Sequence, residues 1–294
     1  MQLIPKIPIP LERYLLSGAI ALLFSIMYAP LILYWYDGWL KKSISIEHEY
    51  FSHGLIGLPF AAYIVWLNYQ QWRQLPDRSH PLGAALLLLG GILYFSGLPE
   101  PVNLSFPAIL TGLCLWFKGI PGFKLQRFPL LLIVLATPNA IPYLIAPYTL
   151  PLQEFIAGTA GFILNQLGLK VTVVQIYLYV GGQIVEVAPF CAGLKMLFTC
   201  IYVSLMLLYW TGNLDSRIKT NLLIIGAIII SVAGNIVRNT LLTYFHGTHQ
   251  EAAFKWLHEG LGGDIYSACM LGLIVVLLNL IDRLIIQEEA VEEN

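Results

Sequence analysis

Charged residues are scarce in this sequence. Asp, Glu, Lys and Arg make up 11% of the 294 residues, whereas hydrophobic residues make up 57% and the mean hydropathy is +0.72. An ordinary soluble domain is about one quarter charged, so this chain has too few polar groups to cover a folded surface in water. The composition excludes such a domain and predicts an integral membrane protein.

A basic excess is also missing. Sixteen Lys and Arg stand against 17 Asp and Glu, and the basic residues are spread along the chain rather than clustered. Proteins that bind nucleic acids carry a clustered basic face. We therefore expect no nucleic-acid partner.

Cysteine pairs and cofactor motifs are absent as well. The chain has four cysteines, and no two of them form a C-x-x-C pair. This excludes a disulfide scaffold and a Cys-rich zinc module. A P-loop, a G-x-S-x-G elbow and a dinucleotide fingerprint are also missing, so the sequence indicates no cofactor.

Long apolar segments are abundant instead. A helix that crosses the hydrocarbon core needs roughly 17 to 25 predominantly apolar residues. The sequence predicts an all-α membrane protein forming a single polytopic domain over residues 1–294, with about eight spans: Tyr14 to Tyr36, His53 to Asn68, Pro81 to Leu98, Leu104 to Phe117, Pro129 to Ile145, Ala192 to Trp210, Asn221 to Phe245, and Ile265 to Ile286.

The distribution of Lys and Arg predicts the orientation, because cytoplasmic loops carry the excess. With the N-terminus inside, four basic residues lie outside (Lys41, Lys42, Lys170, Lys255) and ten lie inside: Lys6, Arg13, Arg73, Arg78, Lys118, Lys124, Arg127, Arg217, Lys219 and Arg283. We expect a plasma-membrane protein with both termini cytoplasmic. The acidic segment 287–294 is then a cytoplasmic tail.

The longest outward segment, residues 147–190, has two parts. Leu150 to Leu167 mixes polar and apolar residues, which favours a helix lying in the membrane interface. Val171 to Val187 is rich in β-branched residues and Tyr around Gly181-Gly182, which predicts a β-hairpin. Prolines crowd the fifth span and its exit and are expected to kink or break it there: Pro129, Pro138, Pro142, Pro147 and Pro151.

Cys191 follows this segment at the predicted start of the sixth span. The N-terminus of a helix favours a thiolate, so the first turn of an outward-pointing helix suits a nucleophile. Lys195 lies four residues further on the same face and either adds positive charge or extends to the interface. The alternative is that Cys191 is a small buried apolar residue.

Asn235 and Arg238 lie three residues apart on the seventh span. An arginine near the end of a span usually faces the protein interior with a partner. Its guanidinium suits the stabilisation of a carbonyl oxygen or a carboxylate. Alternatively, Arg238 forms a structural pair with Glu186 or Asp264.

His258 precedes the last span on the same outward side. An imidazole with a pKa near 6.5 accepts a proton from a thiol and returns it to a leaving amine. Cysteine, arginine and histidine from three separate spans would together suit acyl transfer through a thioester. A second interpretation is a metal-dependent hydrolase that uses His246, His249, His258 and Cys191 as ligands, although no H-E-x-x-H motif accompanies them.

These motifs, in this order, resemble the exosortase/archaeosortase family, and its cyanobacterial exosortases most closely. The resemblance rests on Cys191-x-Gly193-Leu194-Lys195, Asn235-x-x-Arg238, His258, Ser52-His53-Gly54 and the Pro-rich segment with its hairpin from Ala136 to Val187. It implies that Cys191 is the nucleophile, Arg238 the transition-state stabiliser and His258 the third catalytic residue. Many relatives have Ser where this chain has Ala192.

The resemblance also implies a substrate and a reaction. Exosortases process proteins that end in a Pro-Glu-Pro motif, a membrane span and a basic tail. We expect Cys191 to cleave such a signal at the outer face, with Asn235, Glu186, Lys195 and His53 as supporting residues. Membrane lipid and an accessory membrane subunit are the other expected partners. The alternative from a different class is a non-enzymatic transporter or a subunit of an export system, whose charged residues would lie near mid-bilayer.

Overall fold

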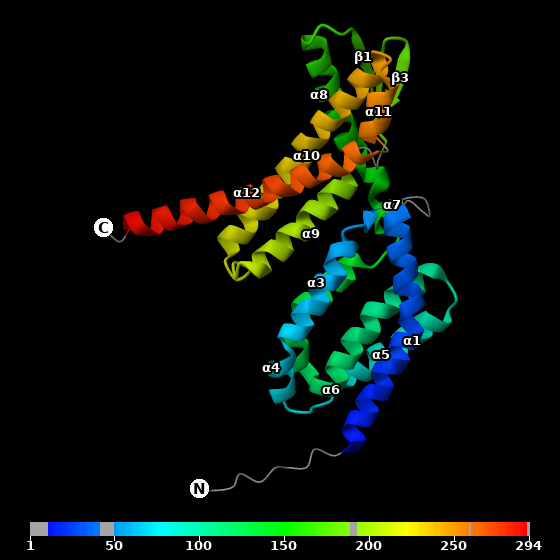
Figure 1. The fold of residues 1–294 in the computed structure, drawn as a ribbon, viewed down its shortest axis with the longest axis vertical. Helices are drawn as coiled ribbons and strands as arrows, with labels where there is room; N and C mark the ends of the chain where they lie inside the picture. The colour runs from blue at the N-terminus through cyan, green and yellow to red at the C-terminus, as the bar shows by residue number, and fades with distance from the viewer. Residues whose placement is uncertain (1–10, 42–49, 189–192, 259, 293–294) are drawn as a thin grey trace.

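The chain folds into a mostly helical protein with one small sheet (Figure 1). The structure is a computed structural model that describes residues 11–41, 50–188, 193–258 and 260–292. Its helices are α1 (Leu11–Lys41), α3 (Gly54–Leu67), α4 (Tyr69–Gln74), α5 (Pro81–Phe95), α6 (Pro99–Ala136), α7 (Ile141–Ile145), the 3₁₀ helix η1 (Ala146–Thr149), α8 (Leu150–Gln166), α9 (Leu194–Trp210), α10 (Arg217–Gly247), α11 (Glu251–His258) and α12 (Leu261–Glu292). The strands are β1 (Val171–Val174), β2 (Tyr177–Val180) and β3 (Gln183–Glu186).

Within these residues, four helices are long and apolar enough to cross a membrane. They are the Gly18–Leu40 part of α1, all of α6 and α10, and the Leu261–Ile285 part of α12. Three further apolar helices, α3, α5 and α9, are shorter, at 14 to 17 residues. The chain is therefore an integral membrane protein, while the predicted count of about eight spans is not confirmed.

Helix α6 reverses its direction at Gly119. A straight helix of 38 residues would be about 57 Å long. Instead, its two ends meet, because Asn103 Nδ2 donates to Pro138 O (3.1 Å) and Ala140 N donates to Glu100 Oε1 (3.0 Å). Gly119 has φ +58° and ψ −151°, which lies outside the helical region. The first half of α6 thus contains the predicted span Leu104 to Phe117, and the second half contains the beginning of the predicted span Pro129 to Ile145.

The predicted fifth span is too long at its C-terminal end. Helix α6 ends at Ala136, and the chain continues as the separate short helices α7 and η1 before α8. Pro142, Pro147 and Pro151 each occupy the first turn of one of these helices, where a missing N–H costs nothing. The predicted break after the fifth span is confirmed, whereas Pro129 stays inside α6.

Close helix contacts hold α5 against the first half of α6. A Cβ on Gly83 would lie 2.6 Å from Trp116 N, and one on Gly90 would lie 2.4 Å from Ile109 Cγ1. Small residues permit such close approach, which provides dispersion energy where lipid removes the hydrophobic driving force. Helix α1 is joined to the same half of α6 by a polar contact, in which Trp35 Nε1 donates to Asn103 Oδ1 (2.8 Å).

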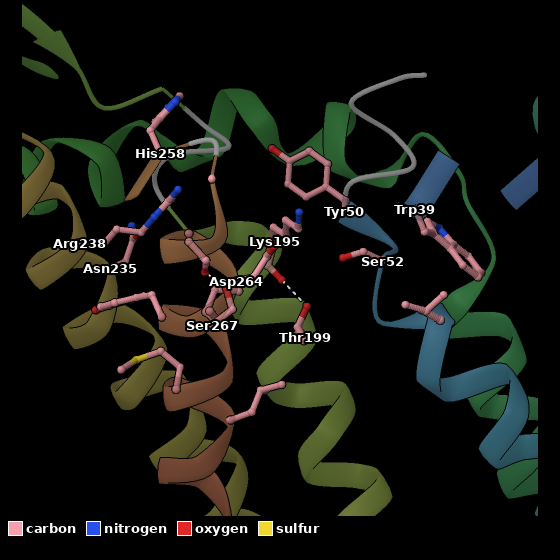
Figure 2. A pocket seen from close by; sticks show the side chains of 18 of the residues that line it. Trp39, Tyr50, Ser52, Lys195, Thr199, Asn235, Arg238, His258, Asp264 and Ser267 are labelled. Carbon is pink, nitrogen blue, oxygen red and sulfur yellow. Dashed lines mark hydrogen bonds between the residues drawn. The ribbon is translucent and has the colours of Figure 1, made fainter. Parts of the chain in front are cut away.

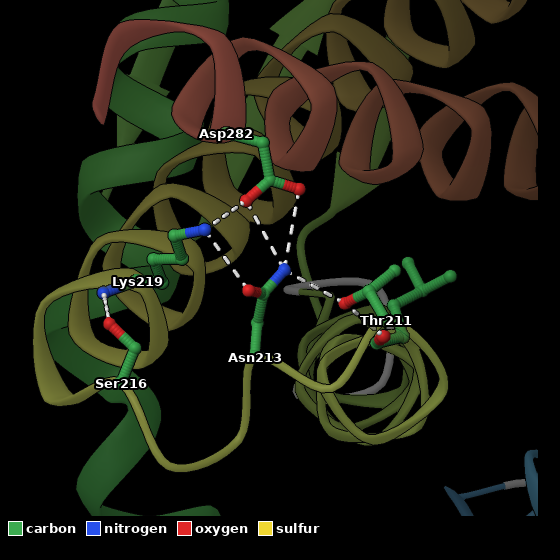
Figure 3. A network of polar contacts seen from close by, with 6 residues as sticks. Thr211, Asn213, Ser216, Lys219 and Asp282 are labelled. Carbon is green, nitrogen blue, oxygen red and sulfur yellow. Dashed lines mark hydrogen bonds and ion pairs between the residues drawn. The ribbon is translucent and has the colours of Figure 1, made fainter. Parts of the chain in front are cut away.

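Helices α9, α10 and α12 form a second group, which a polar cluster ties together at one end (Figure 3). Lys219 Nζ at the start of α10 lies 2.7 Å from Asp282 Oδ1 on α12. Asn213, in the turn between α9 and α10, donates to both oxygens of Asp282 at 3.2 and 3.3 Å. This cluster joins the ends of the three helices and lies toward the opposite end of α10 from Arg238.

The predicted two-stranded hairpin is a three-stranded antiparallel sheet in the order β1-β2-β3. Gly181 and Gly182 form the β2–β3 turn with φ +57° and +78°, as predicted. The β1–β2 turn was missed because it uses Gln175, whose φ is +54°, and Ile176 rather than a recognisable turn pair. The predicted helix from Leu150 to Leu167 is present as α8, and the sheet packs on it through a core that includes Ile156, Leu164 and Leu178.

Candidate functional site

A cavity of about 650 Å³ opens where α9 begins, α10 approaches its end and α12 begins. Figure 2 shows Asn235, Arg238 and His258 on one side of it, Lys195 and Thr199 of α9 in the middle, and Tyr50, Ser52 and Trp39 on the other side. The site therefore draws on six separate parts of the chain. Four of the predicted site residues, Asn235, Arg238, His258 and Lys195, line it.

Cys191, the predicted nucleophile, lies outside the described residues. Gly193, two positions later, is described and lines the cavity. Its φ of +83° is left-handed, so it caps α9 from outside the helix, and α9 begins at Leu194. The predicted sixth span, Ala192 to Trp210, corresponds to α9, and the position of Cys191 at a helix start stays a prediction.

Asn235 is a buried polar residue of the cavity wall. It is 5% exposed, and among the described residues its Nδ2 has no hydrogen-bond partner. Its side chain lies against Gly193, where an added Cβ would come within 2.7 Å of Asn235 Cγ and 2.8 Å of Nδ2. A buried amide donor without a partner costs free energy, which a ligand carbonyl in the cavity would recover.

Arg238 lies one helical turn further along α10 and is partly buried. Asp264, in the first turn of α12, lines the same cavity, whereas Glu186 on β3 does not and lines a smaller neighbouring cavity. Of the two structural pairings considered for Arg238, only the one with Asp264 joins residues of one cavity. The cavity lining thus includes two basic side chains, Lys195 and Arg238, and one acidic side chain, Asp264.

His258 is the last residue of α11 rather than part of a loop. Its ring stacks on Phe254, with centroids 5.2 Å apart and planes 10° apart. Phe254 also contacts His246, whose Nδ1 lies 3.3 Å from Glu251 Oε1. This packing fixes the histidine ring at the rim of the cavity, and His258 also lines the smaller cavity.

His53 lies away from the cavity. It is 5% exposed, its Nε2 lies 3.0 Å from Leu135 O, and its ring centroid is 4.4 Å from that of Tyr202. These contacts tie the start of α3 to the end of α6 and to α9. The neighbouring Ser52, rather than His53, lines the cavity.

A histidine metal centre is not present among the described residues. Within them, no three His, Cys, Asp or Glu side chains gather in a way that could hold a metal ion. His246, His249 and His258 therefore do not form the ligand set that the alternative interpretation needs. Cys191, the fourth residue of that set, lies outside the described part.

Sequence reasoning missed several residues that line the cavity. Trp39 and Tyr50 are each 4% exposed, and Tyr266 donates to Gly234 O on α10. Tyr50 lies two residues before the Ser52-His53-Gly54 motif, which was the available signal for it. Trp39 and Tyr266 lie in apolar helices, and nothing in the local sequence distinguishes them from lipid-facing aromatics.

The comparisons with known proteins agree with the motifs. A family model described as transmembrane exosortase matches residues 35–275. No curated protein and no solved structure matches the chain. The matched region contains the whole cavity and most of the chain, and the family is known as a membrane transpeptidase that acts on protein substrates with sorting signals. The chain belongs to the transmembrane exosortase family.

Proposed function

We propose that this protein is a cysteine transpeptidase that cleaves C-terminal sorting signals through a thioester on Cys191. The observation that carries the proposal is the convergence of Asn235, Arg238 and His258 on one cavity whose wall includes Gly193, two residues after Cys191. Two peptide links span about 7 Å at most, and this short separation along the chain between Cys191 and Gly193 supports the proposal. Membership in a family of membrane transpeptidases supports this activity rather than transport.

The reaction divides into two steps. The Cys191 sulfur attacks the carbonyl carbon of the scissile peptide while His258 takes the thiol proton. The tetrahedral intermediate collapses, the C–N bond breaks, and the amine leaves with the proton from His258. Water or an amine then attacks the thioester, releases the acyl group and restores the thiol.

Arg238 stabilises the oxyanion that forms in both steps. A fixed cation at the rim of a low-dielectric cavity interacts strongly with developing negative charge. The buried Nδ2 of Asn235 is the second donor, because it faces the cavity without a partner among the described residues. Lys195, in the first turn of α9, adds positive potential.

The substrate is a protein that ends in a Pro-Glu-Pro motif, a membrane span and a basic tail. Its span lies in the bilayer beside the bundle, which brings the motif to the outer end of α9, where the cavity opens. The active site then faces the periplasm. An accessory membrane subunit and the identity of the acceptor are further features of this proposal.

Replacement of the nucleophile tests the proposal. A reporter protein with such a C-terminus is reconstituted in vesicles with Cys191→Ala, and cleavage is followed by electrophoresis. We expect the rate to fall by more than about 10³-fold, because removal of a nucleophile removes the covalent route. Cys269→Ala is the matched control, since Cys269 is an exposed cysteine of α12. Cleavage that continues at the wild-type rate in Cys191→Ala would refute the proposal.

A further inference from the structure

The outer edge of β3 presents backbone groups that the sheet does not use. Val187 N donates to Ile176 O (2.9 Å), so Val187 faces β2. Along an antiparallel strand, the backbone N–H and C=O groups of successive residues point alternately to one neighbouring strand and to the other side. The register pairs Val185 with Leu178 and Ile184 with Tyr179. Val185 therefore also faces β2, while Ile184 and Glu186 direct their N–H and C=O groups to the edge.

The other edge of the sheet is already occupied. On β1, Val171 N donates to Asn165 Oδ1 (3.0 Å), and Val171 O accepts from Asn165 Nδ2 (2.9 Å). The side chain of Asn165 thus imitates a neighbouring strand. Val173, the other outward-facing residue of β1, packs on the core between the sheet and α8. Only β3 offers an edge for strand addition within the described sheet.

A small cavity of about 140 Å³ lies beside β3. Three consecutive residues line it, Ile184, Val185 and Glu186, and consecutive side chains on a strand point to opposite faces. The cavity therefore lies at the edge of β3 rather than over one face of the sheet. Its far wall contains Leu242, Phe254 and His258, and its volume suits one side chain rather than a whole ligand.

His258 joins this cavity to the larger one, because it lines both. A chain extended along β3 would run past His258 toward Arg238 and Asn235. We propose that the β3 edge binds the sorting signal as a fourth strand, with one of its side chains in the small cavity and the scissile bond in the larger one. This inference rests on the proposed function and names the surface that recognises the substrate.

Proline at position 184 tests the inference. Proline is tolerated on an edge strand where its nitrogen faces outward, so Ile184→Pro removes the outward N–H and leaves the β2–β3 pairing intact. With the reporter in vesicles, we expect KM to rise about 3- to 10-fold through the loss of one hydrogen bond, with little change in kcat.

Val173→Pro is the matched control on the opposite edge. The backbone N–H of Val173 also points to the outer edge of the sheet, while its side chain packs against α8. This variant therefore disturbs folding at least as much as Ile184→Pro. Expression and thermal melting are measured for both. We expect KM of Val173→Pro to stay within about twofold of the wild-type value.

Three outcomes would overturn strand addition. They are an unchanged KM in Ile184→Pro, an equal rise of KM in Val173→Pro, and, with a photo-cross-linking amino acid at position 184, cross-links to a second copy of the chain instead of the reporter. If Cys191→Ala is inactive and Ile184→Pro is normal, strand addition fails and the proposed function stands. If Cys191→Ala still cleaves, the proposed function itself fails.

Discussion

At the scale of single residues, the site depends on a close contact between two elements. Asn235 on α10 lies directly against Gly193, the residue that caps α9. Gly193 combines a left-handed backbone with a position where no Cβ fits. The contact therefore fixes the start of α9 against α10, one helical turn from Arg238.

Gly193→Ala should lower activity and stability together. A non-glycine residue in the left-handed region costs about 1 kcal/mol or more, and the new methyl group would collide with Asn235. We expect kcat for the reporter to fall by about 10-fold or more, because small displacements of catalytic groups are costly.

Gly168→Ala separates the two causes. Gly168 also has a positive φ, +88°, but an added Cβ there would have nothing within 4 Å. This control should carry the backbone cost alone and keep the wild-type kcat. Equal activity losses in both variants would show that contact with Asn235 does not matter.

At the scale of helices and strands, the sequence predicted the type of most elements and some of their ends. Hydropathy located α5, α9, α10 and α12, because lipid requires long apolar helices whatever their neighbours are. The Gly181-Gly182 pair located the β2–β3 turn, since two consecutive positive φ angles favour glycine. The β1–β2 turn at Gln175 carries no such signal.

The start of α9 shows why helix ends are harder to predict. The composition of residues 192–194 is compatible with a helix. In the structure, Gly193 has a left-handed backbone and lies against Asn235, so α9 begins at Leu194. The same limit applies to the site. Arg238 and His258 were predicted from chemistry and order along the chain, but Tyr50 and Trp39 join the cavity through tertiary packing that no local pattern encodes.

At the scale of the whole molecule, the cavity and the polar cluster lie at opposite ends of α10. Arg238 lies toward one end, and Lys219 pairs with Asp282 at the other. The excess of basic residues in the predicted cytoplasmic loops predicts that the cluster lies inside and the cavity outside. In this proposed orientation the cavity would meet signals on proteins that have crossed the membrane.

Thiol labelling tests this orientation. Gln250, between α10 and α11, and Asp215, between α9 and α10, are both exposed. An impermeant maleimide should label Gln250→Cys from the periplasmic side of intact cells and Asp215→Cys only after lysis. The unsubstituted chain measures labelling of the native cysteines. The reverse pattern would place the cavity in the cytoplasm and contradict the orientation.

The central claim is that the acyl group of the substrate passes through a thioester on Cys191. The most direct measurement adds neutral hydroxylamine during turnover of the reporter and determines the new C-terminus by mass spectrometry, in parallel with detection of an acyl adduct on the peptide that contains Cys191. The account predicts a hydroxamate at the cleavage site, formed by the wild-type protein and absent with Cys191→Ala. Cleavage that yields no hydroxamate and continues in Cys191→Ala would contradict it.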